Sequence, residues 1–328
     1  NKTVLKSGTG YQIFKVLADG TQKQVIQSYS AGNGMKKVDT FYTDATGQVM
    51  TVKPLVSGTY RIYETAAASG YYNKKEVIEF EINSKGNNYE TFEDEDGNTF
   101  ACVTVYQENR ETVGVLKLKK TGQQLASFQN GAFVYENMSL DGVVFEVLAK
   151  EDIKTQDASG EVWFQKGDTV ATITTGKGTE FTNDCAGICS YQIDPEGTIV
   201  IHLPLGKYEI IEKSCPEGFI RDTRSYEFSF SWETQDQEYV LDTVKNSKDD
   251  GTIVIPNQQA KGKIAIEKTD QYRKIPVAGA IYGIYTKHDI WNYKGEKILN
   301  AGDMIGSLTT DQEGKAVLPI EVPIQSSL

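Results

Sequence analysis

Three residue types that can react with one another recur in this sequence as a set. A lysine, a glutamate and an asparagine each reappear 148 positions later (212−64, 257−109 and 268−120). The six residues are Glu64 and Glu212, Asn109 and Asn257, and Lys120 and Lys268. A neutral lysine amine is a nucleophile, and a protonated glutamate can polarise a carboxamide and carry protons. The set therefore predicts an amide bond between lysine and asparagine side chains, formed with loss of ammonia.

This chemistry requires burial, because burial lowers the pKa of lysine and raises that of glutamate, by as much as ~3–5 units. The set lies in segments that alternate apolar and polar residues, as β-strands do. Leu116, Leu118 and Lys120, for example, fall on one face of a strand. The same phase holds in the segments that lead to Lys268, to both glutamates and to both asparagines. We therefore expect each set to point into an apolar core.

Two other interpretations remain open. The lysine and glutamate could form a buried ion pair with the asparagine as a hydrogen-bond partner, or all three could be exposed at strand ends. Identical spacing and shared phase with the core favour the cross-link.

The elements that must position these residues are β-strands almost throughout. Short alternating segments such as 77–82, 199–203 and 226–230 are separated by Gly, Asp, Asn and Pro. No helical period extends beyond two turns. This pattern predicts an all-β chain of tandem Ig-like antiparallel β-sandwich domains arranged end to end.

Internal repeats predict the domain boundaries. An opening strand that ends in Lys-Thr occurs at 114–121 and 262–269, and an aromatic-bearing strand at 13–17, 144–148 and 281–285. We predict domain one at 1–111, domain two at 112–259 and domain three at 260–328. Extra residues near 127–138 and 179–191 of domain two are expected to be loops. Domain three has neither a glutamate strand nor a closing strand, so we expect it to be incomplete.

Charge and hydropathy exclude several partners. The formal net charge is −11, which argues against nucleic acid and anionic membrane surfaces. No apolar segment approaches the roughly 18 residues of a membrane helix, so we expect no membrane insertion in this segment. Asn1 begins no visible signal peptide, which suggests a mature or excised segment.

The remaining motifs are weak. Cys185 and Cys189 lie in a polar loop and could form a local disulfide or remain free thiols, whereas Cys102 and Cys215 have no predicted partner. The acidic stretch 93–98 is better interpreted as a hairpin turn than as a calcium loop. Two histidines in different domains make a His-based catalytic triad improbable. We predict no metal site, no cofactor and no enzyme activity beyond single-turnover cross-linking.

The strands ending in Lys-Thr, the segment Gly206–Glu212 followed by Pro216-Glu217-Gly218-Phe219, and the closing strands ending in Asn resemble SpaA-type (Cna protein B-type) domains. These are prealbumin-like β-sandwiches of Gram-positive pilins and surface adhesins. Two departures are the absence of a proline after Glu64 and the presence of Cys215, where the family typically has a small residue.

The resemblance implies Lys120 as nucleophile, Glu212 as acid/base and Asn257 as acceptor, and Lys2, Glu64 and Asn109 in domain one. Lys268 would be an unpaired cross-link lysine, because its partners lie outside the sequence. The weaker alternatives are Lys6 for Lys2, Lys119 for Lys120 and Asn246 for Asn257.

The leading functional hypothesis is a structural stalk segment of a bacterial surface protein or pilin, extracellular and anchored to the cell wall through sequence beyond this segment. Its partners would be other pilin subunits. A second hypothesis is an adhesin that binds a host extracellular matrix protein or a glycan through domain-two loops. A third is a spacer attached to an extracellular enzyme. No pilin polymerisation motif or sorting signal is found here.

Overall fold

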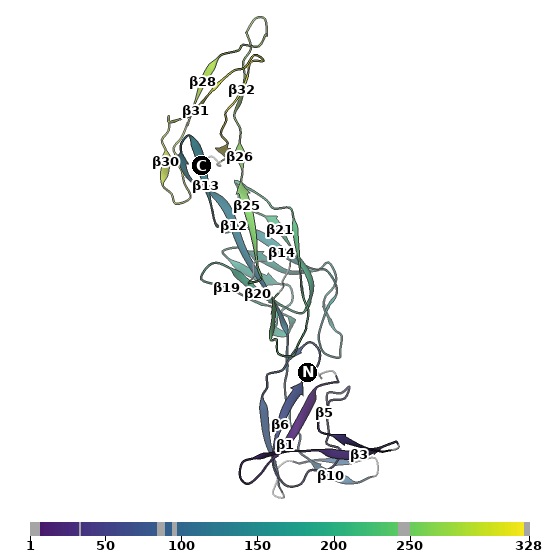
Figure 1. Cartoon of the computed structure of the whole chain (residues 1–328). Coiled ribbons are helices and arrows are strands. Elements are labelled where there is room, and N and C mark those ends of the chain that lie inside the picture. The colour runs from purple at the N-terminus through teal and green to yellow at the C-terminus, as the bar shows by residue number, and fades with distance from the viewer. Residues whose placement is uncertain (1–6, 33, 84–88, 94–96, 242–249, 325–328) are drawn as a thin grey trace.

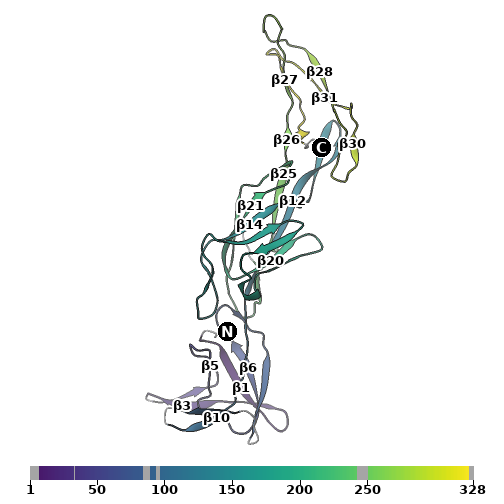
Figure 2. The same ribbon diagram turned by 180° about the vertical axis from the view of Figure 1, so that it is seen from behind.

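The computed structural model describes residues 7–32, 34–83, 89–93, 97–241 and 250–324. Apart from one short 3-10 turn, Cys185–Gly187, its regular elements in these ranges are β-strands, which confirms the all-β prediction. Groups of strands follow one another along a single long axis (Figures 1 and 2). No helix in the described ranges is long and apolar enough to span a membrane.

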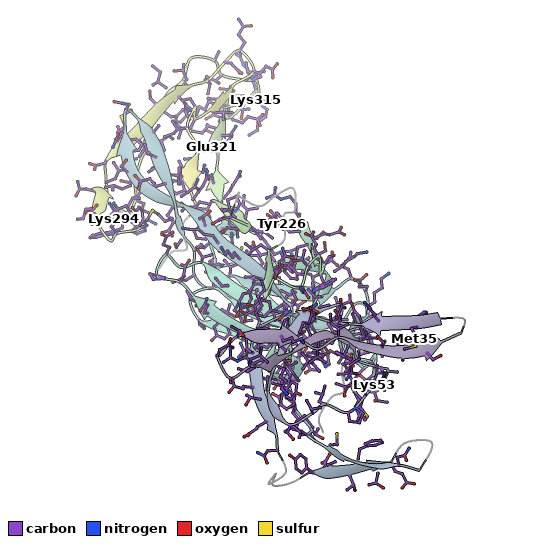
Figure 3. All side chains as sticks on the ribbon, turned by 60° about the horizontal axis from the view of Figure 1, so that its bottom comes forward. Met35, Lys53, Tyr226, Lys294, Lys315 and Glu321 are labelled. Atoms are coloured by element: carbon purple, nitrogen blue, oxygen red, sulfur yellow. The ribbon has the colours of Figure 1, made fainter. Side chains whose placement is uncertain are left out.

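Domain one contains one main sheet in the order β2-β1-β6-β8, with β5 also paired to β1. Its core contains Ile13, Phe41 and Tyr60. The β3–β4 hairpin projects away from this body, with Met35 near its outer end (Figure 3). The strands are β1 Gly10–Val16, β2 Gln22–Gln24, β3 Gln27–Ala31, β4 Gly34–Val38, β5 Phe41–Tyr42, β6 Gly58–Ala66, β7 Tyr71–Tyr72, β8 Val77–Ile82, β9 Glu90–Glu93, β10 Thr99–Cys102 and β11 Arg110–Glu111.

Domain two is a sandwich of two sheets around the largest core of the described residues. One sheet has the order β19-β20-β12-β25-β22, and the other β18-β17-β14-β21-β23. The strands are β12 Val113–Gln129, β13 Ala132–Ser139, β14 Val144–Ala149, β15 Ile153–Lys154, β16 Val162–Phe164, β17 Thr169–Thr174, β18 Gly178–Phe181, β19 Ser190–Ile193, β20 Ile199–Leu203, β21 Gly206–Ser214, β22 Phe219–Ile220, β23 Ser225–Phe230, β24 Tyr239–Leu241 and β25 Thr252–Gln259.

The strand pairings in domain two are antiparallel with two exceptions. The first strand, β12, runs parallel to β25 and to β24. Parallel neighbours require a long connection between them, and here nearly the whole domain lies between β12 and β25. The first and last strands of the domain are therefore hydrogen-bonded neighbours, which places Lys120 and Asn257 in the same sheet.

Domain three is formed by strand pairs. β26 pairs β33, β27 pairs β32, β28 pairs β31 and β29 pairs β30. The strands are β26 Lys261–Gly262, β27 Ala265–Glu267, β28 Ile281–Tyr285, β29 Ile290–Trp291, β30 Lys297–Leu299, β31 Met304–Thr309, β32 Lys315–Val317 and β33 Val322–Pro323.

The expectation of a loop at 127–138 is wrong. These residues belong to a long β-hairpin, formed by the second half of β12 and by β13. Leu125 and Phe133 of this hairpin are buried in one apolar cluster with Leu299, Leu308 and Leu318 of domain three. The apolar residues of the insertion are used for packing between domains, and pairing of the two strands satisfies their backbone groups.

The expected closing strand of domain one, 103–109, is also not formed as a paired strand. Its side chains still alternate, with Val103, Val105 and Asn109 partly buried and the residues between them mostly exposed. In domain two the corresponding β25 pairs with β12. Residues 103–109 thus keep the phase of a strand, and the residues before Ser7 lie outside the described residues.

Candidate functional site

The domain-two site lies on strands from both sheets of the sandwich. Lys120 of β12 has Ile255 as its register partner in β25, so Asn257 lies two residues further along on the same face. Glu212 is on β21 of the facing sheet. Their exposed fractions are 4% for Lys120, 2% for Glu212 and 1% for Asn257. The expectation from strand phase, that these three side chains point into the core, therefore agrees with their burial.

Glu212 contacts both of the other side chains. One carboxylate oxygen, Oε1, accepts a hydrogen bond of 2.7 Å from Nδ2 of Asn257. The other, Oε2, lies 3.8 Å from Nζ of Lys120. The carboxamide oxygen Oδ1 of Asn257 is buried and has no hydrogen-bond partner among the described residues. A carboxyl group is thus held between an amine and a carboxamide in a site without exposed groups.

The surroundings of Lys120 shift its amine towards the neutral form. Burial lowers the pKa of Lys120 to about 8, although the charge of Glu212 opposes this shift. Nζ also donates hydrogen bonds to the carbonyl oxygens of Ile255 at 2.9 Å and Thr121 at 3.0 Å. A neutral amine with two of its protons directed at carbonyls keeps a lone pair that can attack a carbon atom.

Domain one contains the same glutamate–asparagine contact. Nδ2 of Asn109 donates to Oε1 of Glu64 over 2.7 Å, and Nε2 of Gln107 donates to Oε2 over 3.1 Å. Glu64 is buried, and burial raises its pKa, against the opposing effects of the Asn109 hydrogen bond and the charge of Lys74. Oδ1 of Asn109 is buried without a hydrogen-bond partner among the described residues, as in domain two.

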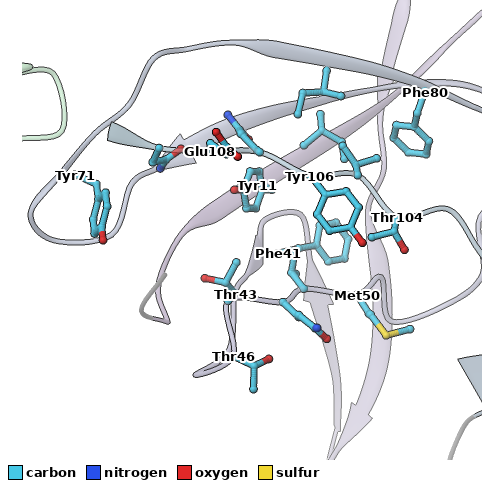
Figure 4. A pocket seen from close by; sticks show the side chains of 18 of the residues that line it. Tyr11, Phe41, Thr43, Thr46, Met50, Tyr71, Phe80, Thr104, Tyr106 and Glu108 are labelled. Atoms are coloured by element: carbon cyan, nitrogen blue, oxygen red, sulfur yellow. The ribbon is translucent and has the colours of Figure 1, made fainter. Parts of the chain in front are cut away.

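The lysine of domain one is not placed. Lys2 and its alternative Lys6 both lie outside the described residues. A groove of about 1870 Å³ is lined by residues of domain one and by residues of domain two, among them Trp163 and His202. Phe41 of the domain-one core and Tyr106 of the segment 103–109 line it (Figure 4), and so do Ile13 and Val105.

The expectation that Lys268 points into an apolar core is wrong. Ile264 and Ile266 contact the domain-three cluster, but β27 ends at Glu267 and Lys268 after it is exposed. Lys119 is partly exposed and lies 3.9 Å from Glu196, on the opposite strand face from Lys120. The alternative acceptor Asn246 lies outside the described residues. No cluster of potential metal ligands is found in the described ranges.

Cys185 and Cys189 are both buried, at 0% and 7% exposure, with their sulfur atoms 2.6 Å apart. The Cys185–Gly187 turn brings the two cysteines together. The Ala186 N–H of this turn donates a hydrogen bond to the side chain of Asp184. The burial of these two side chains was not evident from the polar sequence of the loop, most of whose other residues are exposed. Their disulfide stays a prediction.

One predicted repeat was aligned in the wrong register. The repeat of 13–17 with 144–148 equates Phe14 with Phe145. In the structure the residue equivalent to Phe145 is Tyr11, because Tyr11 pairs with Glu64 as Phe145 pairs with Glu212. Phe14 instead contacts the Tyr63 ring on the other face of the sheet. Tyr11 and Phe14 are both aromatic, and only strand pairing shows which of them lies opposite Glu64.

One family model, described as the SpaA prealbumin-like fold domain, matches residues 7–96 and 114–248. No curated protein matches the chain.

Solved structures match with low similarity. A Bacillus anthracis protein called TIE is 13% identical, with a TM-score of 0.45, over 98% of this chain and 41% of its own. A streptococcal ancillary pilin is 17% identical, with a TM-score of 0.29, over 97% and 81%. The major pilin subunit BcpA of Bacillus cereus is 16% identical, with a TM-score of 0.31, over 97% and 81%.

The family assignment rests on the family model, which covers more than half of the chain in two separate regions. The chain belongs to the SpaA family of prealbumin-like fold domains.

Proposed function

We propose that this chain is a stalk segment of a bacterial surface protein or pilin whose domains lock themselves with Lys–Asn isopeptide bonds. The observation that supports it best is the buried position of Glu212, in contact with Asn257 and 3.8 Å from Lys120. Such a segment would be extracellular and linked to the cell wall through sequence beyond this segment. Assembly with other pilin subunits is part of the proposal.

The reaction uses only groups of this site. The neutral amine of Lys120 attacks the carboxamide carbon of Asn257, and protonated Glu212 donates a hydrogen bond to the developing oxyanion. Glu212 then transfers a proton from the lysine nitrogen to the departing nitrogen. A C–N bond to Lys120 forms, the C–NH₂ bond breaks and ammonia leaves. The reaction occurs once per site and needs no oxidant or cofactor.

The orientation of the Asn257 carboxamide depends on the protonation state of Glu212. Nδ2 of Asn257 donates to the carboxylate of Glu212 in the structure. A protonated Glu212 would instead donate to Oδ1, which requires only a half-turn of the carboxamide, and the two orientations differ in the assignment of O and N. The now unpartnered Oδ1 would then gain a hydrogen bond.

Intact mass of the purified chain tests the proposal. The sample is reduced first, so that a disulfide between Cys185 and Cys189 does not change the mass. Each bond lowers the mass by one ammonia, and digestion should yield a branched peptide joining Lys120 to Asn257. Replacing Glu212 with Ala should restore one ammonia and lower resistance to heat and protease. A wild-type chain with its full sequence mass contradicts the proposal.

The matched control is Glu209→Ala on the same strand. Glu209 faces away from Glu212 in β21 and contacts Lys150 on the partly exposed side. This variant should keep the ammonia loss. A Glu212→Ala chain that retains the branched peptide would show that another residue acts as the acid/base.

A further inference from the structure

A loop of domain two lies against the glutamate site of domain one. This docking loop, Trp232–Glu238, follows β23. Oε1 of Gln235 accepts a hydrogen bond of 2.6 Å from the Ala67 N–H, and its Nε2 donates to the Thr65 carbonyl over 3.1 Å. Its own carbonyl accepts from the Asn73 N–H over 2.8 Å. Gln235 therefore fixes both ends of the segment that follows Glu64.

Asn73 transmits this contact to the glutamate. Its side chain is 2% exposed. Nδ2 donates to the carbonyl of Glu64 over 3.1 Å, and Oδ1 accepts from the Lys75 N–H over 2.8 Å. The backbone of Glu64 is thus bonded to a residue whose own backbone is bonded to Gln235.

The docking loop also binds the chain that follows Asn109. Nη1 of Arg110 lies 3.4 Å from Oε1 of Glu238, and the Val113 N–H donates to the Glu238 carbonyl over 2.9 Å. Oγ1 of Thr112 donates to the Gln237 carbonyl over 3.0 Å. One loop therefore holds the chain beside both members of the Glu64–Asn109 pair.

Two further observations place Glu64 at a domain boundary. A cavity of about 380 Å³ is lined by Glu64 and Asn73 from domain one and by Gln235 and Asp236 from domain two. In domain two the residue nine positions after Glu212 is Arg221, whose guanidinium itself donates to the Glu212 carbonyl over 2.8 Å. In domain one the corresponding donor to the Glu64 carbonyl is Asn73, which has a shorter side chain. Gln235 of domain two in turn accepts a hydrogen bond from the backbone N–H of Asn73.

We propose that Gln235 is a positioning residue for Glu64, so that cross-linking at Asn109 of domain one depends on docking of domain two. This inference rests on the function proposed above. Domain two would supply part of the domain-one site without touching the reacting atoms. Hydrogen bonds between Gln235 and three backbone groups hold the carboxyl in the position at which it contacts Asn109.

The test compares Gln235→Ala with the loop control Glu233→Ala in the whole chain. Glu233 is exposed. Chain recovered unfolded and unreacted is refolded over a pH series, and ammonia loss is followed separately in the Asn109 and Asn257 peptides. We expect Gln235→Ala to slow the Asn109 reaction roughly tenfold, in keeping with the loss of one part-buried and one exposed hydrogen bond. The Asn257 reaction and the control should be unchanged.

The pH profile separates positioning from general destabilisation. A loosened loop admits water to Glu64, so the upper pH limit of the Asn109 reaction should move to lower pH in Gln235→Ala. Gln235→Glu keeps the acceptor for Ala67 but loses the donor to Thr65, so its rate should lie between those of wild type and Gln235→Ala. An unchanged rate and profile in Gln235→Ala, or equal slowing at Asn109 and Asn257, overturns the inference.

A second measurement keeps the inference testable if wild type forms no bond at Asn109. That result would contradict the proposed bond in domain one. The positioning role of Gln235 is then tested separately, by amide hydrogen exchange of residues 64–73 and by titration of the Glu64 carboxyl. Faster amide exchange and a lower Glu64 pKa in Gln235→Ala would support the positioning role of Gln235. An exchange rate and a Glu64 pKa equal to those of wild type would overturn it.

Discussion

Lys120 has opposing influences on its amine. Burial favours the neutral form, the charge of Glu212 favours the ammonium form, and burial has the larger effect. Nζ of Lys120 lies 3.8 Å from Oε2 of Glu212 in a buried site. Until the amine reacts, the folded state therefore carries the free-energy cost of desolvating it. The amide product has no amine to ionise, so bond formation removes the cost of burying an ionisable group at this position.

This balance predicts a pH dependence in a chain that cannot react. In Asn257→Ala, Lys120 keeps its amine, with a folded pKa of about 8 against an ordinary 10.5. The unfolded chain then binds more protons between these values, so the free energy of unfolding should rise as pH increases from about 8 to about 10.5. The rise reaches roughly 3 kcal/mol.

Urea unfolding at a series of pH values measures this effect. The double variant Asn257→Ala/Lys120→Met has no titrating group at this position and should lack that part of the rise. If the two curves stay parallel from pH 8 to pH 10.5, the lysine amine is not held neutral by burial.

At the scale of elements, β12 has two roles. Its first half carries Lys120 in the domain-two sheet, and its second half forms the hairpin with β13 that packs on domain three. Hydrogen bonds support this contact, because Nδ2 of Asn292 donates to the Ala126 carbonyl and the Tyr293 N–H donates to that of Leu125, both over 3.0 Å. Nζ of Lys261 lies 4.2 Å from the centre of the Tyr135 ring. Domain three is therefore attached through the hairpin as well as through the chain.

Removing the hairpin contact should loosen domain three. Phe133→Ala deletes a buried ring from the shared cluster and should destabilise domain three by about 3 kcal/mol. Hydrogen exchange of β28 and β31 amides should accelerate, while that of β14 and β21 should not. The neighbouring Val134→Ala, at an exposed position, is the control. Equal exchange in both variants would show that the hairpin does not support domain three.

At the scale of the whole molecule, the proposed bond changes the path of force. Lys120 and Asn257 lie in the neighbouring first and last strands of domain two. A covalent link between them closes a loop that contains most of the domain. On the chain-entropy model this stabilises the folded state by about 5 kcal/mol. Tension along the axis of the molecule would pass through the link without opening the sheets.

Single-molecule pulling measures this directly. The link shields the 136 residues between Lys120 and Asn257 (257−120−1) from extension. Asn257→Ala should therefore show an added unfolding step with a contour length of roughly 450–490 Å, which wild type lacks. Wild-type traces that contain the same step would mean that force does not pass through a covalent link in domain two.

The sequence alone indicated the all-β class, the family resemblance and the burial phase of Lys120, Glu212 and Asn257. These follow from side-chain alternation, which is a local property with a period of two. The register of Tyr11 against Glu64 was not accessible in the same way, because two aromatic residues three positions apart fit the pattern equally well.

Only the tertiary structure decided which segments meet across domain boundaries. The 127–138 insertion has the alternation of strands, but Leu299, Leu308 and Leu318, with which Phe133 packs in domain three, are more than 150 positions away. Gln235 lies 170 positions from Thr65, and no local pattern marks it as a neighbour of Glu64. The sequence determined which residues could react, because reactivity and strand phase are local. The structure decided what holds them in place, because that depends on contacts between distant segments.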